Sequence, residues 1–382
     1  MAEGTSGIVI DNGSGYTKAG FAGDDAPRCY FPSIVGKPKM PGIMVGFDQK
    51  DVYVGNEANE KRSVLNIISP IKQGVIKDWE GIEDIWFHTM SNELKVPPDQ
   101  HPVLLSEPPL NPKGNREKVT SAMFEEFKVQ GLYMGVQAVL ALYSSGKTTG
   151  MVLDSGDGIT HAVPIYEGYA IPHAIKPIEL AGSDVTRFLI KQLSKRGILL
   201  DTSAEYEIAQ ELKEKNCSVA TDYEQESKTF GEIKEIALPD NNALLVKEKS
   251  AKDIAIGKEK YMCPEILFQP CIDERNYTEG IPKIVFDSIN SCDVEVRRDL
   301  YKDIILSGGN TLFSGFSERI AKELKCLAPS SMNVKVLASA ERKCMVWIGG
   351  SILASLATFQ SMFINRADYN EAGPSIVHRK CF

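Results

Sequence analysis

A glycine-rich segment that occurs twice constrains this chain more than any other feature of its sequence. Residues 7–18 read GIVIDNGSGYTK, and residues 150–161 read GMVLDSGDGITH. Each copy starts as an apolar strand, reaches an aspartate where the strand ends, turns through alternate glycines and continues as a second short strand. Asp11 and Asp154 stand at equivalent positions. The repeat predicts two half-domains of strands and helices, the first closing near residue 144 and each starting with the same hairpin.

The two glycine turns are suited to binding phosphate. Glycine at alternate positions lets several backbone N–H groups converge on one point, which is how a turn holds phosphate without large side chains. Two such turns could bind a polyphosphate from both sides, with the carboxylates of Asp11 and Asp154 available to its metal ion. A single D-x-G-x-G is commonly an ordinary hairpin turn. Because a second copy matches it here, we favour the phosphate site.

The composition is that of a globular protein without a nucleic-acid-binding face. The 382 residues predict two or three domains, and 43% hydrophobic with 25% charged residues is ordinary for a soluble protein. A net charge of −8 argues against nucleic acid as a partner, because such binding normally needs a basic surface. The eight cysteines contain no C-x-x-C pair, so we expect reduced thiols in an intracellular protein.

One uncharged stretch, residues 346–364, approaches the length of a membrane span. It contains two glycines, three serines, a threonine and a glutamine, which lower its hydropathy. We therefore predict a buried helix packed through small residues, and no association with a membrane.

Hydrophobic periodicity and capping residues predict further elements. Expected helices cover residues 79–94, 116–127, 182–197, 314–324, and a segment ending at 216 that opens with a Thr202–Glu205 capping box. We expect a buried strand at 103–105 and a strand-to-glycine turn at 303–310. In that turn Gly308 and Gly309 would let the backbone approach a purine or a ribose.

Two segments have the composition of surface structure. Residues 222–262 are dense in both charges and are expected to form the body of an inserted subdomain, with a hairpin around 239–242. Residues 36–51 mix proline and glycine with apolar residues and predict a mobile loop. Its Ile43, Met44, Val45 and Phe47 would either insert into a partner's groove or form a local cluster within a small subdomain.

Taken together, these features resemble actin almost from end to end. The densest similarity lies in residues 11–15, 18–28, 31–36, 153–158, 163–170, 347–356 and 371–382, the last reading EAGPSIVHRKCF. The chain is similar to a divergent member of the conventional actin family. The resemblance implies the actin-like ATPase fold, in which two related α/β domains, together four subdomains, surround a nucleotide cleft.

The resemblance also implies domain boundaries. The outer domain would comprise residues 1–144 with a small inserted subdomain at 33–69. The inner domain would comprise residues 145–344 with an inserted subdomain at 181–276, and residues 345–382 would return to the outer domain.

The resemblance further implies a site for ATP or ADP with Mg²⁺ or Ca²⁺. Phosphate oxygens would be held from one side by Ser14, Gly15, Tyr16 and Lys18, and from the other by Gly156, Asp157 and Gly158. Asp11, Gln137 and Asp154 would orient waters on the cation, since Mg²⁺ prefers to keep much of its hydration shell. The ribose and adenine contacts would come from Gly182, Lys213, Glu214, Gly308, Gly309, Phe313 and Lys343. Gln210 replaces the usual arginine, which leaves one base or ribose contact in question.

The implied activity is slow, Mg-dependent hydrolysis of ATP to ADP and phosphate, coupled to assembly. Gln137 and His161 would position the attacking water, and with Asp11 and Asp154 they form the expected catalytic set. Phosphoryl transfer depends mostly on placement and charge neutralisation, so this modest set suffices. Without the resemblance, His161 would be interpreted as a core histidine.

The chain departs from the actin pattern at several places. Its N-terminus retains only Glu3 of an acidic cluster, which predicts weaker motor binding, and Gln73 replaces a histidine that actins often methylate. About six extra residues lie near 247–252. Where the family has an apolar loop that bridges two filament strands, residues 271–279 carry Asp273, Glu274, Arg275 and Glu279. Charged side chains do not readily replace apolar burial, so self-assembly is less secure than partner binding.

The cleft that receives actin-binding proteins is better preserved. Its matching residues are Tyr143, Gly146, Thr148, Tyr169, Ile348, Ile352, Leu353, Thr358 and Met362.

Three functions fit these observations. The first is a cytoplasmic, cytoskeletal ATPase that polymerises with itself. The second is a monomeric actin-type subunit of a larger complex, such as an axonemal inner-arm dynein in the cilium, with its heavy chain, or a nuclear chromatin remodeller. The third is a sugar kinase or a chaperone ATPase of the same superfold, although no residues remain for a chaperone's peptide-binding domain.

Overall fold

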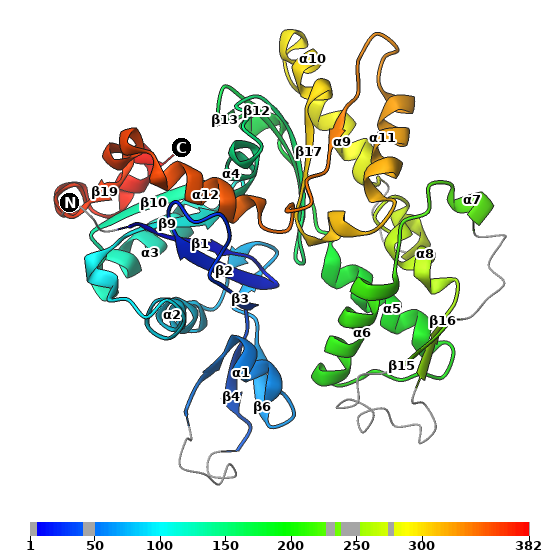
Figure 1. Ribbon diagram of the computed structural model, residues 1–382, viewed down its shortest axis with the longest axis horizontal. Helices are drawn as coiled ribbons and strands as arrows, with labels where there is room; N and C mark the ends of the chain where they lie inside the picture. Colours follow the sequence, from blue (N-terminus) through cyan, green and yellow to red (C-terminus); the bar gives the residue numbers. More distant parts are fainter. Residues whose placement is uncertain (1–5, 41–49, 227–233, 238–252, 274–278, 382) are drawn as a thin grey trace.

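The structure is a computed structural model that describes residues 6–40, 50–226, 234–237, 253–273 and 279–381. Figure 1 shows two α/β halves side by side, the first built from the N-terminal part of the chain and the second from its middle. The C-terminal segment returns to the first half, where β19 (Ile364–Asn365) pairs with β10 (Gly131–Val136).

The first sheet has the strand order β19-β10-β9-β1-β2-β3. Its other members are β9 (Pro102–Glu107), β1 (Ile8–Asn12), β2 (Tyr16–Phe21) and β3 (Cys29–Pro32). Strand β1 is antiparallel to β2 and parallel to β9. Every residue of β1 and β9 is buried, as expected for central strands that are covered on both faces.

The second sheet repeats this arrangement with the order β13-β12-β11-β17-β18. Its strands are β13 (Tyr169–Ala170), β12 (Thr160–Tyr166), β11 (Gly150–Ser155), β17 (Ile304–Ser307) and β18 (Val336–Leu337), and β14 (Lys176–Ile178) also pairs with β12. Strand β11 is antiparallel to β12 and parallel to β17. The predicted repeat is therefore confirmed: each half contains the same hairpin with a parallel strand on its other side.

Helices make up much of the remaining structure in both halves (Figure 1). In the first half these are α2 (Trp79–Phe87), α3 (Lys113–Ser121), α4 (Gln137–Ser144), α12 (Met345–Ser355), α13 (Arg366–Ala372) and α14 (Val377–Lys380). In the second they are α5 (Gly182–Ser194), α6 (Ser203–Asn216), α7 (Tyr223–Glu226), α8 (Glu259–Glu265), α9 (Ile281–Asn290), α10 (Val294–Lys302) and α11 (Phe316–Leu327).

All five predicted helices are present, some with shifted ends. Helix α2 continues as a π-helical segment, His88–Glu93, so the prediction for 79–94 holds. Helix α3 begins at Lys113, immediately after Pro112, which is earlier than predicted, and continues as a π-helical segment to Glu126. The Thr202–Glu205 capping box is confirmed at the start of α6.

The prediction of one helix over 346–364 is wrong in its length. Helix α12 ends at Ser355, Leu356 is extended, and the remainder forms a 3₁₀ segment, Ala357–Met362, followed by β19. The absence of charge reflects burial of successive elements, which periodicity could not separate. Packing through small residues is confirmed, because a β-carbon on Gly349 would collide with the carbonyl oxygen of Leu140 in α4. Among the described residues, no helix is long and apolar enough to cross a membrane.

A small three-stranded sheet projects from the first half (Figure 1). It consists of β4 (Val35–Pro38), β5 (Tyr53–Val54) and β6 (Leu65–Ile68), with α1 (Gly55–Glu60) beside it. A separate small core of Ile34, Tyr53, Ala58 and Leu65 holds it together. The predicted loop therefore starts only after β4, and Ile43, Met44, Val45 and Phe47 lie outside the described residues.

Two short ribbons complete the fold. Strands β7 (Ile71–Lys72) and β8 (Val75–Ile76) form a hairpin near the first sheet. Strands β15 (Lys234–Ala237) and β16 (Asp253–Ile256) pair as antiparallel neighbours, which confirms a hairpin within 222–262. The predicted turn at 239–242 and the extra residues near 247–252 lie outside the described residues.

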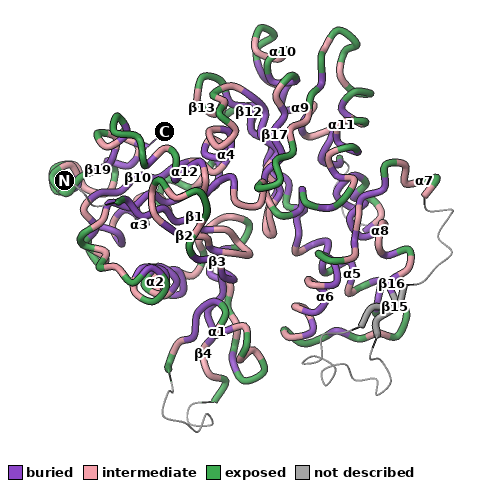
Figure 2. The backbone as a smooth tube through the Cα atoms, in the orientation of Figure 1, coloured by how far each residue is buried: buried purple, intermediate pink, exposed green. Residues whose placement is uncertain are grey.

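The buried residues form two main cores, shown in purple in Figure 2. One contains Trp86, Leu104 and Trp347, and the other contains Phe188 and Phe316. The first core also takes in Val152 of the second sheet. The two halves therefore share apolar packing at this point.

Candidate functional site

The two hairpins place equivalent side chains at equivalent points. In the first, Asp11 pairs across the strands with Lys18. In the second, Asp154 pairs with His161. Residues directly opposite each other in an antiparallel pair project from the same face of the sheet. Each hairpin therefore presents a carboxylate beside a nitrogen-bearing side chain, a lysine in the first and a histidine in the second.

The glycine turns of the hairpins face each other at very short range. A β-carbon added to Gly15 would lie 2.8 Å from Cβ of Asp157, and one added to Gly158 would lie 2.6 Å from Oγ of Ser14. The same Ser14 Oγ accepts a hydrogen bond of 3.0 Å from the backbone N–H of Gly74. Glycine is thus required by the close approach of the two turns, which forms a cradle lined with backbone groups.

A cavity of about 250 Å³ lies between the two turns. The predicted nucleotide and metal residues that line it are Asp11, Ser14, Gly15, Tyr16, Lys18, Gln137, Asp154, Gly156, Asp157, Gly158, Gly182, Lys213, Glu214, Gly308, Gly309, Phe313 and Lys343. His161 does not line it. The structure therefore brings residues from distant parts of the sequence to one place.

At one end of the cavity Asp11 is held by a network of polar groups. Its carboxylate accepts hydrogen bonds from Lys18 Nζ at 2.7 Å and from Ser106 Oγ at 2.6 Å. The amide of Gln137 donates to Ser106 Oγ at 3.3 Å, so Ser106 links the two side chains. Burial alone would lower the pKa of Lys18, but the adjacent Asp11 carboxylate outweighs it and the pKa is raised. The ammonium group is therefore firmly charged.

Asp154 approaches the same end from the second hairpin. Burial raises the pKa of its carboxyl group, and the nearby Asp11 charge raises it further. A cation between the two carboxylates would relieve both effects. No three His, Cys, Asp or Glu side chains converge for direct ligation within the described ranges. Two carboxylates and the Gln137 amide suit a hydrated Mg²⁺, which they would contact through its waters.

His161 is buried, with 4% of its surface exposed. Burial lowers the pKa of its imidazole to about 4, so the ring is neutral near neutral pH. It lies opposite Asp154 in the β11–β12 pair and does not line the cavity. This position agrees with the interpretation as a core histidine, and its role toward an attacking water stays a prediction.

At the other end of the cavity, polar side chains fix the helices that approach it. Lys213 Nζ donates a hydrogen bond of 3.0 Å to the carbonyl of Gly182, and burial lowers the pKa of Lys213. Gln210 donates to Glu214 Oε1 at 3.1 Å and to the hydroxyl of Tyr16 at 3.5 Å. Gln210 therefore reaches the cavity although it replaces the expected arginine.

Sequence reasoning missed several residues of the cavity. Asn310 closes the predicted 303–310 turn, and its amide donates to Ser155 Oγ at 3.1 Å and to the Gly156 carbonyl at 2.7 Å. Because Asn310 directly follows Gly308 and Gly309 in the sequence, it could have been predicted as a residue of the site. Tyr30 and Leu312 also line the cavity, but neither belongs to a pattern that could be detected in the sequence.

The residues predicted to receive partners lie on α4, β13 and the segment containing α12 (Figure 1). Tyr169 and Ile352 are exposed. Tyr143 is half-buried, and Ile348, Leu353 and Met362 are half-buried against the first core.

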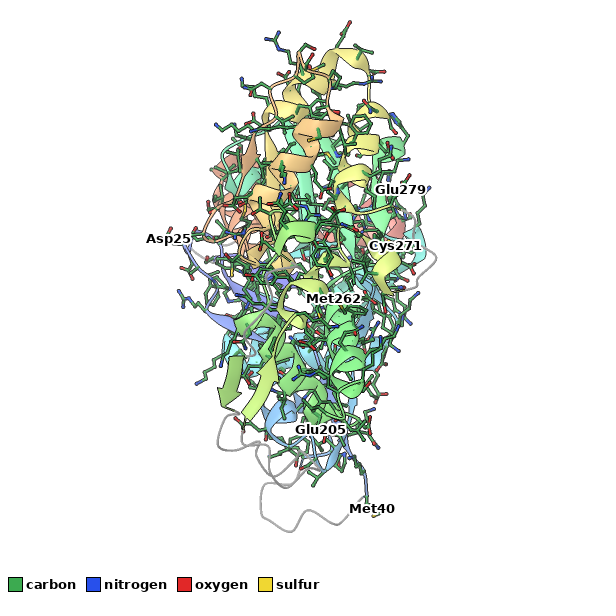
Figure 3. All side chains as sticks on the ribbon, turned by 90° about the vertical axis from the view of Figure 1, so that its right-hand side faces the viewer. Asp25, Met40, Glu205, Met262, Cys271 and Glu279 are labelled. Carbon is green, nitrogen blue, oxygen red and sulfur yellow. The ribbon has the colours of Figure 1, made fainter. Side chains whose placement is uncertain are left out.

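The charged residues of the segment at 271–279 lie in different environments. Asp273 is buried and accepts a hydrogen bond of 3.0 Å from Lys191 of α5, so this charge is not on the surface. Cys271 and Glu279 are exposed and lie at the same edge of the molecule in Figure 3. Glu274 and Arg275 lie outside the described residues, as does Glu3 at the N-terminus.

Two related halves, each with the same hairpin, thus enclose one cavity between their glycine turns. Gln73, which replaces the often-methylated histidine, lies beside this cradle in a left-handed conformation, with a φ of 51°. The sequence model of the actin family matches residues 2–382, nearly the whole chain. The chain belongs to the actin family.

Proposed function

We propose that this protein binds ATP with Mg²⁺ between its two hairpins, hydrolyses the nucleotide slowly and assembles into cytoskeletal filaments. The close approach of the turns, Gly15 to Asp157 and Gly158 to Ser14, carries this proposal. It brings the glycine turns of both halves to one small volume, which Asp11 and Asp154 also line. That arrangement fits a polyphosphate and its cation.

Individual residues would have distinct roles in this reaction. Lys18 would supply positive charge to phosphate oxygens, while Ser14, Gly15, Asp157 and Gly158 would hold them through short polar contacts. A bound Mg²⁺ supplies charge neutralisation at the phosphates. Asp11, Asp154 and Gln137 would orient its waters, and Gln137 would also align the attacking water. The neutral ring of His161, which stands opposite Asp154 in β12, would help Gln137 to position that water.

We also infer that the cavity lies between an outer domain, residues 1–144 plus 345–382, and an inner domain, residues 145–344. The pairing of β19 with β10 supports the return of the C-terminal segment to the outer domain. The small core of Ile34, Tyr53, Ala58 and Leu65 supports the inserted subdomain at 33–69. The β15–β16 ribbon supports the one at 181–276.

A second candidate is a monomeric actin-type subunit of a larger assembly, such as a ciliary dynein or a nuclear chromatin remodeller. The ion pair between Asp273 and Lys191 favours it. It ties the start of the 271–279 segment to α5, and charges occupy a segment that a filament contact would bury.

Sedimentation of the pure protein with Mg-ATP separates the two candidates. Filament formation predicts a pellet above a threshold protein concentration, with ADP and phosphate released as the pellet forms. The subunit hypothesis predicts no pellet at any concentration, together with recovery of a stoichiometric complex by affinity purification from cells. Actin-binding proteins that contact Tyr169 and Ile352 are expected to bind in both cases.

A further inference from the structure

Two tyrosine rings stack against each other in the wall of the cavity. Tyr16 of β2 and Tyr30 of β3 have ring centroids 4.6 Å apart and planes inclined by 14°. Both residues line the cavity, and so does Lys343. Only Tyr16 and Lys343 belong to the predicted nucleotide site, so Tyr30 has no assigned role.

Lys343 is placed by these rings. Its ammonium nitrogen lies 5.3 Å from the Tyr16 centroid and 4.7 Å from the Tyr30 centroid, both within the range of cation–π attraction. A lysine side chain carries much rotamer freedom, and contact with the two aromatic rings reduces that freedom. Tyr30 makes the shorter of the two contacts.

The Tyr30 hydroxyl does not explain why a tyrosine stands here. Its oxygen is buried and has no hydrogen-bond partner in the described part of the chain. Burial and the neighbouring carboxylate of Glu214 raise the pKa of Tyr30, so the hydroxyl stays protonated. A buried hydroxyl without a partner lowers stability. The contact that Tyr30 makes with the site is therefore made by its ring, not by its hydroxyl.

We infer that Tyr30 is a positioning residue for nucleotide binding: its ring, stacked on Tyr16, holds the Lys343 ammonium group against the nucleoside half of the bound nucleotide. This inference rests on the proposed function. Ser14 and Gly158 lie in the predicted phosphate-binding turns. Tyr16 follows Gly15 of the first turn, but its hydroxyl accepts a hydrogen bond from Gln210, which also donates to Glu214 on the predicted base and ribose side. The stacked ring of Tyr16 therefore connects the phosphate side to the nucleoside side, where Lys343 is predicted to lie.

The test measures the affinity of the full chain for AMP, ADP and ATP by calorimetry. Tyr30→Phe keeps the ring and is expected to bind all three nucleotides like the wild type. Tyr30→Leu removes the ring and is expected to weaken binding about threefold to tenfold. Because the contact is to the nucleoside half, the loss should be equal for AMP, ADP and ATP. If Tyr30→Leu does not fold, the same measurement is made with Tyr30→Met, whose longer side chain fills more of the space left by the ring.

A double-mutant cycle with Lys343→Met identifies the route of the effect. If Tyr30 acts through Lys343, the double variant Tyr30→Leu/Lys343→Met should bind no worse than Lys343→Met alone. Lys118→Met is the matched control, since Lys118 lies over the ring of Trp79 at 4.4 Å and neither residue lines the cavity. It should leave nucleotide affinity unchanged.

The outcomes separate this inference from the proposed function. Wild-type protein that binds no adenine nucleotide would overturn the proposed function itself. Wild-type protein that binds, with Tyr30→Leu binding equally well, would overturn only the role of Tyr30. The same holds if the losses in the double variant are additive, if they grow with the number of phosphates, or if Tyr30→Phe loses as much as Tyr30→Leu.

Discussion

Arg62 and Glu207 form an ion pair between the small inserted sheet and helix α6, with 3.1 Å between Arg62 Nη2 and Glu207 Oε2. Arg62 also donates to the carbonyl of Ser203, and Asn59 donates to Glu207. Both partners of the ion pair line a second cavity, of about 690 Å³, that shares Ser14, Asp157 and Gly158 with the first. The pair therefore lies in the cavity that adjoins the proposed nucleotide site.

Breaking this pair should speed the release of nucleotide. Arg62 is largely buried, with 12% of its side chain exposed, so its loss should matter more than that of a surface pair. We expect Glu207→Gln to raise the dissociation rate of a fluorescent ATP analogue by about twofold to fivefold in stopped-flow measurements.

A matched control lies on the same helix. Glu211 pairs with Lys215 on the exposed face of α6, so Glu211→Gln should not change the dissociation rate. Equal rates for the wild type and Glu207→Gln would show that the pair does not restrain the nucleotide.

His161 should make the protein sensitive to acid. Its pKa is about 4 in the folded chain, against about 6.5 for an unfolded histidine, so the unfolded state binds the extra proton between these values. Stability from this group is complete above pH 6.5 and is lost as the pH falls toward 4. Between pH 7 and pH 5 the loss should be about 2 kcal/mol of unfolding free energy.

Urea unfolding at both pH values, without added nucleotide, measures this effect. His161→Gln cannot titrate, so its unfolding free energy should fall by about 2 kcal/mol less than that of the wild type. Identical pH dependence in the two proteins would show that the pKa of His161 in the folded chain is the same as in the unfolded chain.

A substitution at Gly349 tests how closely α12 packs on α4. A β-carbon there would collide with the Leu140 carbonyl oxygen, and backbone cannot move aside cheaply. Gly349→Ala should therefore lower the unfolding free energy by about 2 kcal/mol or more, although alanine is the better helix former. Chemical denaturation is the measurement.

Gly114 provides the opposite case in helix α3. A β-carbon there would meet nothing within 4 Å, so Gly114→Ala should be neutral or stabilise by about 0.5 kcal/mol. If both substitutions stabilise, α12 and α4 are further apart than described.

Breaking the buried ion pair between Arg319 and Glu265 should lower the unfolding free energy by a large amount. Arg319 Nη2 lies 2.7 Å from Glu265 Oε1, and the Glu265 side chain is fully buried. Burial raises the pKa of Glu265 in spite of its partner. Arg319→Met should cost about 3 kcal/mol, because it leaves a buried acid without its partner. Arg319→Met combined with Glu265→Leu should recover part of this loss in thermal denaturation. If stability is not recovered, the loss in Arg319→Met does not come from the unpaired Glu265.

The sequence was most informative where the chemistry is local. Asp11 and Asp154 were predicted at equivalent positions because the turn and its aspartate are contiguous in each copy, and the structure pairs them with Lys18 and His161 in matching registers. The Thr202–Glu205 cap was predicted for the same reason, since its hydrogen bonds join residues three positions apart.

Long-range pairing explains what was missed. Arg62 meets Glu207 only because two distant segments fold together, and nothing in either segment indicates the other. The burial of Asp273 could not be predicted either, since the sequence gives no sign that Lys191 lies beside it. The end of α12 at Ser355 was missed because the apolar composition continues into β19, where different neighbours supply the burial.

The central claim is that Asp11 and Asp154 receive the cation of a nucleotide held between the two hairpins. Titration calorimetry of ATP, with Mg²⁺ and with EDTA, tests it directly on the wild type and on Asp11→Asn/Asp154→Asn. We predict that Mg²⁺ strengthens binding to the wild type by at least about tenfold and that the double variant loses this gain while keeping weaker binding. Absence of ATP binding by the wild type, or an undiminished Mg²⁺ effect in the double variant, would contradict the account.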